Sequence, residues 1–487
     1  MPPTTVPPGD GIQRLLDRPP DLPVVGGLSA LTTALREGGT AVVQAPPGTG
    51  KTTLVPPPVA AMVSGRVVVT QPRRIAARAA ARRLAGLLGE RVGETVGHTV
   101  RGDRAVSAAT RVEFVTTGVL LRRLQRDPEL PGVSAVVLDE VHERQLDADL
   151  TLAFLADVRS TLRDDLLLVA MSATVEAERT AAVLGDVPVV DVPGALYPVA
   201  EHWAPPPPGV LPTDERGVPP RFLDHVAATV RKALAADAGD ALVFVPGVAE
   251  VDGVVRRLSG LPDVDVLALH GRLPPREQDL ALARGPRRRV VVSTAVAESS
   301  LTVPGVRIVV DAGLSREPRT DQVRGLPALV TVRVSRSAAE QRAGRAGREG
   351  PGAVHRCWSR ADHGHLGAHP APEIAVADLT GFCLELAAWG APDGEGLALL
   401  DRPPPAALQS AHDTLTGLGA VDEAGAITAR GRVIAQVPAD PRLARALIDG
   451  AEAVGARRAA EVVALLDDDV RAPGGDLGSD FEARRRG

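Results

Sequence analysis

The chain has 487 residues, of which 44% are hydrophobic and 24% charged, so its length allows two to four globular domains, each with its own core. Its formal net charge of -5 excludes nucleic-acid binding driven by overall charge, and any such binding requires a local basic groove. The sequence has two cysteines, no secretory signal pattern and no run of about 18 apolar residues, so we expect a cytoplasmic protein that neither enters nor crosses a membrane.

A short helix is predicted at residues 28–35 and a strand at residues 41–43, and the strand leads into a turn that we expect to bind phosphate groups. Glycines let backbone N–H groups close around phosphates, Lys51 reaches the terminal phosphates, and the Thr52 hydroxyl is a ligand for Mg²⁺. Lys51 is one of only two lysines among 55 Lys and Arg residues, which indicates that this position requires a compact ammonium group. Ala45 stands where the usual pattern has glycine, and alanine does not easily adopt a left-handed backbone. The predicted nucleotide-binding residues of this loop are Ala45, Pro46, Pro47, Gly48, Thr49, Gly50, Lys51, Thr52 and Thr53.

Strands and helices alternate after this loop. Further strands are predicted at residues 66–70, 113–115, 135–138 and 166–170, and a helix at residues 75–88. This alternation predicts an α/β fold with a parallel, doubly wound sheet, whose ligands bind at the carboxyl ends of the strands.

An acidic sequence, Asp139-Glu140-Val141-His142, follows the strand predicted at residues 135–138. Asp139 beside a phosphate loop can hold Mg²⁺ through water, and Glu140 can orient and deprotonate an attacking water. The predicted metal site therefore consists of Thr52, Asp139 and Glu140. We expect His142 to make a contact in the cleft that links the nucleotide site to the second half of the chain. A solvated acidic turn is the alternative interpretation.

The prolines of residues 193–220 predict a stiff linker. A second alternating unit follows, with strands predicted at residues 241–245, 264–269, 289–293, 306–311 and 330–334. The sequence QRAGRAGR is predicted to open a helix, with Arg345 and Arg348 one turn apart on one face. An arginine from outside the phosphate loop can stabilise charge on a transferred phosphoryl group, and here it would come from across a domain cleft.

Seven motifs in order resemble those of the superfamily 2 DEAH-box helicases: APPGTGKT, TQPRRIAA, TTGVLL, DEVH, SAT, STAVAESSLT and QRAGRAGR. The segments SRSAAEQRAGRAGR, APEI, LTGFCLELAAWG and DPRLARAL are more specifically similar to the bacterial HrpB type. The resemblance implies two tandem RecA-like domains that bind ATP and Mg²⁺ in a shared cleft, followed by a small winged-helix domain and the start of a helical, ratchet-like unit. The implied parts are an N-terminal tail (1–24), a first RecA-like domain (25–195), a linker (196–222), a second RecA-like domain (223–370), a winged-helix-like domain (371–440) and a helical helicase-associated unit (441–487).

The resemblance also implies roles for individual residues. Gln341, Arg345 and Arg348 would sense the γ-phosphate and act as arginine fingers, beside Glu140 and His142 as catalytic residues. Arg83 would stack on adenine, and Ser172 and Thr174 would couple hydrolysis to domain movement. Ala295 replaces the asparagine of the family pattern. Backbone contacts to a nucleic-acid strand are implied for Arg73, Arg74, Arg101, Thr117, Thr294 and Thr302, although arginines in such segments also occur as solvated helix faces.

The resemblance therefore implies an ATP-dependent RNA helicase, which hydrolyses ATP, remodels duplexes or RNA–protein complexes and, if it behaves as its relatives do, moves 3′ to 5′ on single-stranded RNA. A DNA or dual-substrate helicase is one alternative, because no residue identifies a contact to the ribose 2′-hydroxyl group. A nucleic-acid-binding scaffold with weak ATPase activity is an alternative of another class, and the intact Lys51, Glu140, Arg345 and Arg348 argue against it. We expect a monomer, truncated at its C-terminus relative to the HrpB type.

Overall fold

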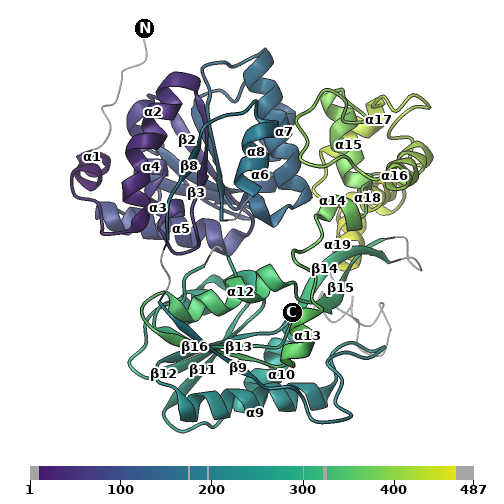
Figure 1. Ribbon diagram of the computed structural model, residues 1–487. Helices are drawn as coiled ribbons and strands as arrows, with labels where there is room; N and C mark the ends of the chain where they lie inside the picture. The colour runs from purple at the N-terminus through teal and green to yellow at the C-terminus, as the bar shows by residue number, and fades with distance from the viewer. Residues whose placement is uncertain (1–9, 174–175, 195–196, 300, 322–325, 468–487) are drawn as a thin grey trace. The chain divides into compact units, whose positions relative to one another are not determined.

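The computed structural model describes residues 10–173, 176–194, 197–299, 301–321 and 326–467. The chain divides into two compact units (Figure 1). Unit 1 comprises Met1–Glu317 and Leu329–Pro372, and unit 2 comprises Pro318–Ala328 and Glu373–Gly487. Within the described ranges, every helix is too short or too polar to cross a membrane.

The first sheet of unit 1 has eight strands in the order β4-β3-β5-β2-β6-β7-β1-β8. All neighbouring strands are parallel except β3 and β4, which are antiparallel. The strands are β1 (Thr40–Gln44), β2 (Arg66–Gln71), β3 (Val96–Val100), β4 (Asp103–Ala105), β5 (Val112–Thr116), β6 (Val133–Leu138), β7 (Leu167–Ser172) and β8 (Val189–Asp191). The five strands predicted in this half are confirmed, whereas β3, β4 and β8 were not predicted.

Helices lie between the strands of the first sheet along the chain, as a doubly wound fold requires. The central strands are short runs of valine, alanine and leucine that are buried on both faces, and the helices supply the apolar side chains that cover them. The helices are α1 (Asp10–Asp17), α2 (Leu28–Gly38), α3 (Lys51–Leu54), α4 (Pro56–Met62), α5 (Arg74–Leu88), α6 (Thr117–Arg126), α7 (Leu146–Thr161) and α8 (Glu176–Val183), with 3-10 turns η1 (Pro23–Gly27) and η2 (Val141–Glu143).

The second sheet of unit 1 has six parallel strands in the order β11-β12-β10-β13-β16-β9. The strands are β9 (Val199–Trp203), β10 (Asp240–Phe244), β11 (Val264–Leu269), β12 (Arg288–Ser293), β13 (Val306–Asp311) and β16 (Gly352–Arg356). The helices are α9 (Pro220–Ala236), α10 (Val248–Leu258), α11 (Pro275–Leu282), α12 (Arg336–Gly344) and α13 (Arg360–Gly364), with 3-10 turns η3 (Ala295–Ala297) and η4 (Arg345–Gly347). Figure 1 shows α9 and α12 on opposite faces of this sheet. The prediction of two tandem parallel-sheet domains is confirmed.

One part of the predicted linker is wrong. Residues 196–222 were expected to connect the two sheets, but β9 lies within this range and pairs in parallel with β16. Because β9 is an edge strand with mostly exposed side chains, it lacks the continuous apolar run that identifies a buried strand in a sequence. The second sheet therefore begins before the proline-rich segment.

The strands β14 (Leu314–Asp321) and β15 (Leu326–Arg333) form a separate two-stranded sheet. The strand predicted at residues 330–334 therefore overlaps β15 and, contrary to expectation, does not belong to the second sheet. From residue 373 to residue 467 unit 2 is mainly helical, and the only isolated β-bridge within this range joins Val421 to Ile427. Its helices are α14 (Glu373–Val376), α15 (Thr380–Trp389), α16 (Pro405–Gly417), α17 (Ala429–Ala435), α18 (Pro441–Val454) and α19 (Ala456–Asp467). The assignments of 371–440 to a winged-helix-like domain and of 441–487 to a ratchet-like unit stay predictions.

Candidate nucleotide site

The loop after β1 has the backbone expected of a phosphate-binding turn. Gly48 and Gly50 have φ angles of 95° and 91°, which side chains disfavour, and Gly50 immediately precedes α3. Ala45 does not have a positive φ, so the alanine at this position causes no backbone strain. Its N–H group donates to the carbonyl oxygen of Ser172 at the end of β7, 2.9 Å away, which ties the loop to the neighbouring strand.

The N-terminal turn η1 supports the same loop. The Val24 N–H donates to the Thr49 carbonyl oxygen over 3.1 Å, and a Cβ added to Gly50 would lie 2.7 Å from a methyl carbon of Leu22. The sequence did not predict this support, because residues 1–24 were expected to form a tail.

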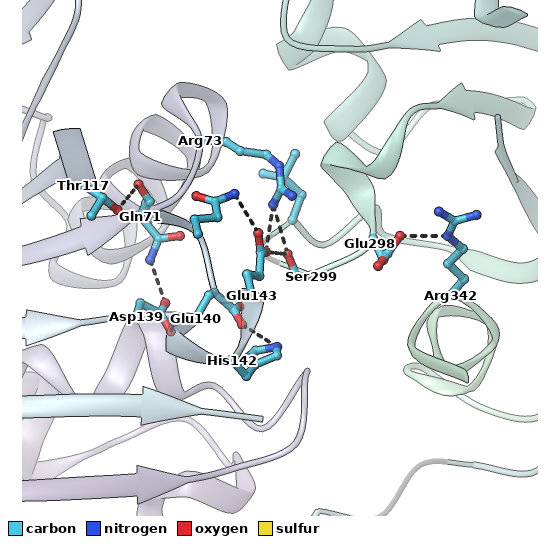
Figure 2. Close-up of polar contacts among 12 residues, drawn as sticks. Gln71, Arg73, Thr117, Asp139, Glu140, His142, Glu143, Glu298, Ser299 and Arg342 are labelled. Atoms are coloured by element: carbon cyan, nitrogen blue, oxygen red, sulfur yellow. Dashed lines mark hydrogen bonds and ion pairs between the residues drawn. The ribbon is translucent and has the colours of Figure 1, made fainter. Parts of the chain in front are cut away.

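Two buried carboxylates face the side chains that follow the loop. Lys51 Nζ lies 3.3 Å from Glu140 Oε2, and both side chains are at least 96% buried. The Thr52 hydroxyl donates to Asp139 Oδ2 over 2.5 Å, and Gln71 Nε2 donates to the same oxygen over 2.6 Å. Figure 2 shows Gln71, Asp139 and Glu140 side by side at the ends of their strands. The structure therefore brings together all three predicted metal-site residues and adds Gln71.

The two carboxyl groups have opposite pKa shifts. Burial and the adjacent Glu140 raise the pKa of Asp139, despite the nearby ammonium of Lys51. Burial alone would also raise the pKa of Glu140, but the nearby charge of Lys51, which also donates a hydrogen bond to this carboxylate, outweighs burial and lowers that pKa. Glu140 is therefore ionised at neutral pH. The φ of Glu140 is 57°, which is uncommon for a residue with a side chain. Such backbone conformations occur often at functional sites.

His142 connects Glu140 to the end of β7. Its Nδ1 accepts a hydrogen bond from the Ala173 N–H over 3.2 Å, so the neutral ring carries its proton on Nε2, which lies 3.4 Å from Glu140 Oε2. Burial lowers the pKa of His142, which favours this neutral form. The contacts of His142 therefore lie within the first sheet, and the expected link to the second half of the chain is not among them. Ser172 is buried beside this contact, and Thr174 lies outside the described residues.

Arg348 of the second half lies against the phosphate loop. A Cβ added to Gly48 would be 3.5 Å from Arg348 Nε, and Arg348 Nη1 donates to the Thr302 hydroxyl over 2.8 Å. Burial lowers the pKa of Arg348 to about 10, so the group still carries its charge at neutral pH. Arg348 therefore lies where it was predicted, beside the phosphate loop. Thr302 was predicted to contact nucleic acid. In the structure its hydroxyl accepts a hydrogen bond from Arg348, and its contact with a strand stays a prediction.

Arg345 is buried and held by backbone carbonyl groups. Its guanidinium group donates to the carbonyl oxygens of Glu298, Ser299 and Leu301, and Glu140 is among the charges that raise its pKa. Burial, followed by the nearby charge of Arg348, lowers the pKa of Arg345 well below its ordinary value, because two guanidinium groups lie close together. Such a pair is suited to bind an anion.

The motif QRAGRAGR was predicted to begin a helix, and this prediction is wrong. This motif ends α12 at Gly344 and continues as the 3-10 turn η4, instead of opening a helix. In a 3-10 turn, residues three apart align, so Arg345 and the following Arg348 still project to one side. Gln341 lies half-buried in the last part of α12.

Arg342 in the same motif has a structural role that the sequence did not reveal. It pairs with Glu298 over 2.7 Å and with Asp311 over 2.9 Å, and it lies over the Phe244 ring. Since Glu298 also supplies one of the carbonyl oxygens that hold Arg345, Arg342 fixes the loop that positions Arg345.

A polar bridge joins the two halves of unit 1. Glu143 follows the acidic motif, and its carboxylate accepts hydrogen bonds from Arg73 over 2.9 Å and from the Ser299 hydroxyl; Arg73 also donates to the Ser299 oxygen over 3.2 Å. Figure 2 shows Glu143 between Arg73 and Ser299. Arg73 was predicted to bind a nucleic-acid strand, but in this structure its guanidinium group is engaged in the bridge. The sequence signal for Glu143 was its place directly after the acidic motif.

The other predicted residues are distributed more widely. Arg74, Arg83 and Arg101 are exposed, and Thr294 is half-buried after β12. Thr117 is buried at the start of α6, and its hydroxyl donates to the Gln71 carbonyl oxygen over 3.4 Å. The predicted adenine and strand contacts of these residues stay predictions.

The donor set fits a magnesium ion. Two carboxylates and a threonine hydroxyl converge beside a phosphate loop, and the buried Gln71 Oε1 has no hydrogen-bond partner within the described part of the chain. Oxygen donors of this kind are the ligands that Mg²⁺ prefers, and a cation would offset the repulsion that raises the Asp139 pKa.

Comparison with known proteins agrees with this geometry. Residues 28–183 match the family described as DEAD/DEAH box helicase, and residues 225–350 match the helicase conserved C-terminal domain. The first match covers the first sheet except β8, and the second match covers the second sheet except β9 and β16.

Individual relatives are similar over most of the chain. The ATP-dependent RNA helicase HrpB of Escherichia coli (strain K12) is 41% identical over 94% of this chain and 56% of its own length. The probable ATP-dependent RNA helicase DHX34 of Homo sapiens is 34% identical over 88% of this chain and 38% of its own length. The crystal structure of the E. coli DEAH/RHA helicase HrpB superposes with a TM-score of 0.86 at 40% identity, over 95% of this chain and 58% of that one. This chain thus spans little more than half the length of its bacterial relative.

Proposed function

Because this chain belongs to the DEAD/DEAH-box helicases of the HrpB type, we propose that it is an ATP-dependent RNA helicase that hydrolyses ATP and moves 3′ to 5′ along single-stranded RNA. The observation that carries the proposal is the approach of Arg348 to Gly48, which brings a cation from the second sheet to the phosphate loop of the first. The substrates are ATP and single-stranded RNA, and we propose a cytoplasmic monomer.

The first sheet supplies the groups that would bind ATP and Mg²⁺ and activate the attacking water. Backbone N–H groups of the loop around Gly48 and Gly50 and the ammonium of Lys51 would hold the β- and γ-phosphates. Thr52 and Asp139 would hold Mg²⁺, with Glu140 close by. When Mg²⁺ is bound, it neutralises part of the negative charge of the phosphates.

Glu140 is the proposed general base. Its low pKa keeps it ionised, and its carboxylate would orient a water molecule and accept a proton from it as the water attacks the γ-phosphate. When a nucleotide enters, Lys51 can turn from Glu140 to the phosphates, which frees the carboxylate for the water. His142 would hold Glu140 in place through its Nε2 proton.

The second sheet supplies charge to the transferred phosphoryl group. Arg345 and Arg348 would act as fingers, since among the described residues their guanidinium groups donate to backbone carbonyl oxygens and to the Thr302 hydroxyl rather than to a carboxylate. Gln341 would sense the γ-phosphate. Loss of that phosphate would change the contacts of both arginines and of the bridge Arg73–Glu143–Ser299, which would couple hydrolysis to movement of one sheet against the other.

RNA as the substrate is supported by the relatives, whose names describe RNA helicases. The proposed contacts to the strand backbone are Arg73, Arg74, Arg101, Thr117, Thr294 and Thr302, of which Arg74, Arg101 and Thr302 are exposed.

The test is ATP turnover measured without nucleic acid, with single-stranded RNA and with single-stranded DNA of the same sequence. The proposal predicts slow basal turnover that RNA increases most, and loss of turnover in Lys51→Ala. Equal increases with RNA and DNA would favour a dual-substrate helicase. Equally slow turnover in all three conditions would favour a scaffold.

A further inference from the structure

A second cluster of metal-binding side chains lies at the outer edge of the second sheet. His202 of β9 and His355 of β16 are register partners on neighbouring parallel strands, so both side chains point to the same face. Their rings stack with centroids 4.7 Å apart and an angle of 20° between the ring planes. Asp237 follows the end of α9, and its Oδ2 lies 3.0 Å from His355 Nε2.

The geometry of the three side chains suits one small cation. One ligand atom from each of His202, Asp237 and His355 lies within 4.8 Å of the others. His355 is buried, Asp237 is half-buried and His202 is exposed. A metal ion could therefore reach the cluster from solvent at His202 and bind a ligand, His355, that is shielded from water. None of the three belongs to the nucleotide site or to the proposed strand contacts.

The positions of these ligands are fixed by the fold. Strand pairing sets the two histidines, and Arg288 holds the turn that carries Asp237 by donating to the carbonyl oxygens of Leu234, Asp237 and Gly239. The hydrogen bond between His355 and Asp237 explains why these two side chains lie together, but it does not explain the position of His202. The stacked ring of His202 adds a second nitrogen donor that this pair does not require, and stacked imidazoles repel each other when both are protonated.

We propose that His202, Asp237 and His355 form a binding site for a divalent transition-metal ion of the Zn²⁺ class. Two imidazole nitrogens and one carboxylate oxygen are a common three-residue set for zinc, with a water molecule as the fourth ligand. Calcium and magnesium are disfavoured because they require oxygen ligands.

The ion would be structural. It would fasten β9 to β16 and to the end of α9, at the point where the chain enters the second sheet. Metal binding there would stabilise the second sheet against unfolding of its edge strand.

The experiment is titration of the tag-free, full-length chain with Co²⁺, read by visible absorption, and equilibrium dialysis with Zn²⁺. We expect one ion per chain, a tetrahedral Co²⁺ spectrum that Zn²⁺ abolishes, and a higher unfolding temperature with Zn²⁺. His202→Ala and Asp237→Asn should each weaken binding by at least about tenfold, as loss of a metal-site group commonly does. The matched control is His369→Ala, which removes an exposed histidine outside the cluster and should bind as the parent chain does.

Three results would overturn the proposal: no binding by the parent chain at millimolar metal, unchanged affinity in both His202→Ala and Asp237→Asn, or loss of binding in His369→Ala. Because His202 is exposed, its replacement should leave the far-ultraviolet circular dichroism unchanged. These readouts do not depend on ATP hydrolysis.

Discussion

Glu140→Gln separates nucleotide binding from hydrolysis. The glutamine has the same length and can still accept a hydrogen bond from Lys51, which lies 3.3 Å from the carboxylate, so ATP binding should remain. The amide cannot accept a proton from water at neutral pH. Loss of a general base usually costs a factor of about 10² to 10⁴, which corresponds to about 3 to 5 kcal/mol of activation free energy.

The assay is single-turnover ATP hydrolysis with saturating RNA, next to equilibrium binding of a fluorescent ATP analogue. We expect hydrolysis to fall at least about a hundredfold and the dissociation constant to stay within about threefold, because only the proton acceptor is removed. Glu37→Gln is the matched control, since Glu37 is exposed on α2. Hydrolysis by Glu140→Gln at the parent rate would refute the assignment of Glu140 as the base.

Three further outcomes are expected. Arg348→Ala should lower single-turnover hydrolysis by about 10³ or more, the scale for an arginine finger, while ATP still binds; near-parent turnover would contradict the finger role. Glu143→Gln should weaken the bridge to Ser299 and reduce the stimulation of turnover by RNA more than the basal rate, and equal effects on both rates would argue against coupling through this bridge. Glu113 is buried beside Arg66 and Arg123; burial would raise its pKa, but Arg123, Thr99 and Arg66 lower it below the ordinary 4.5. The ionised Glu113 should therefore contribute its full stabilisation above about pH 4.5, and this contribution should be lost as the pH falls through the lowered pKa of the folded state. In urea titrations, Glu113→Gln should have a free energy of unfolding about 3 kcal/mol lower than that of the parent chain at pH 7, and this free energy should fall less steeply as the pH is lowered. The same decrease of stability with falling pH in both proteins would contradict this expectation.

Much of the nucleotide site could be predicted from the sequence because its signals are local. The loop around Lys51 and the acidic motif at Asp139 each combine a buried strand with a short polar turn, and strand ends in a parallel sheet converge. The structure places their side chains within hydrogen-bond distance, as this reasoning requires.

The bridge between the halves could not be predicted, because it depends on pairs far apart in the sequence. Glu143 and Ser299 are separated by 156 positions, and nothing near either residue indicates its partner. Arg73 and Thr302 were assigned to nucleic acid because their residue types suit a phosphate backbone. The sequence did not indicate the protein partners that the fold also gives them, and their contacts with a strand stay predictions.

Edge strands were also missed. Val199–Trp203 reads as polar and lies before a run of prolines, so only its pairing with β16 identifies it as a strand. This omission hid the alignment of His202 with His355, and with it the metal-binding cluster.

The most direct test of the account is a crystal structure of this chain with Mg²⁺, ADP and an aluminium fluoride mimic of the transferred phosphoryl group. The account predicts that Lys51 contacts the mimic from the first sheet and that Arg345 and Arg348 donate hydrogen bonds to it from the second. A mimic bound at Lys51 with both guanidinium groups directed away from it would contradict the central claim.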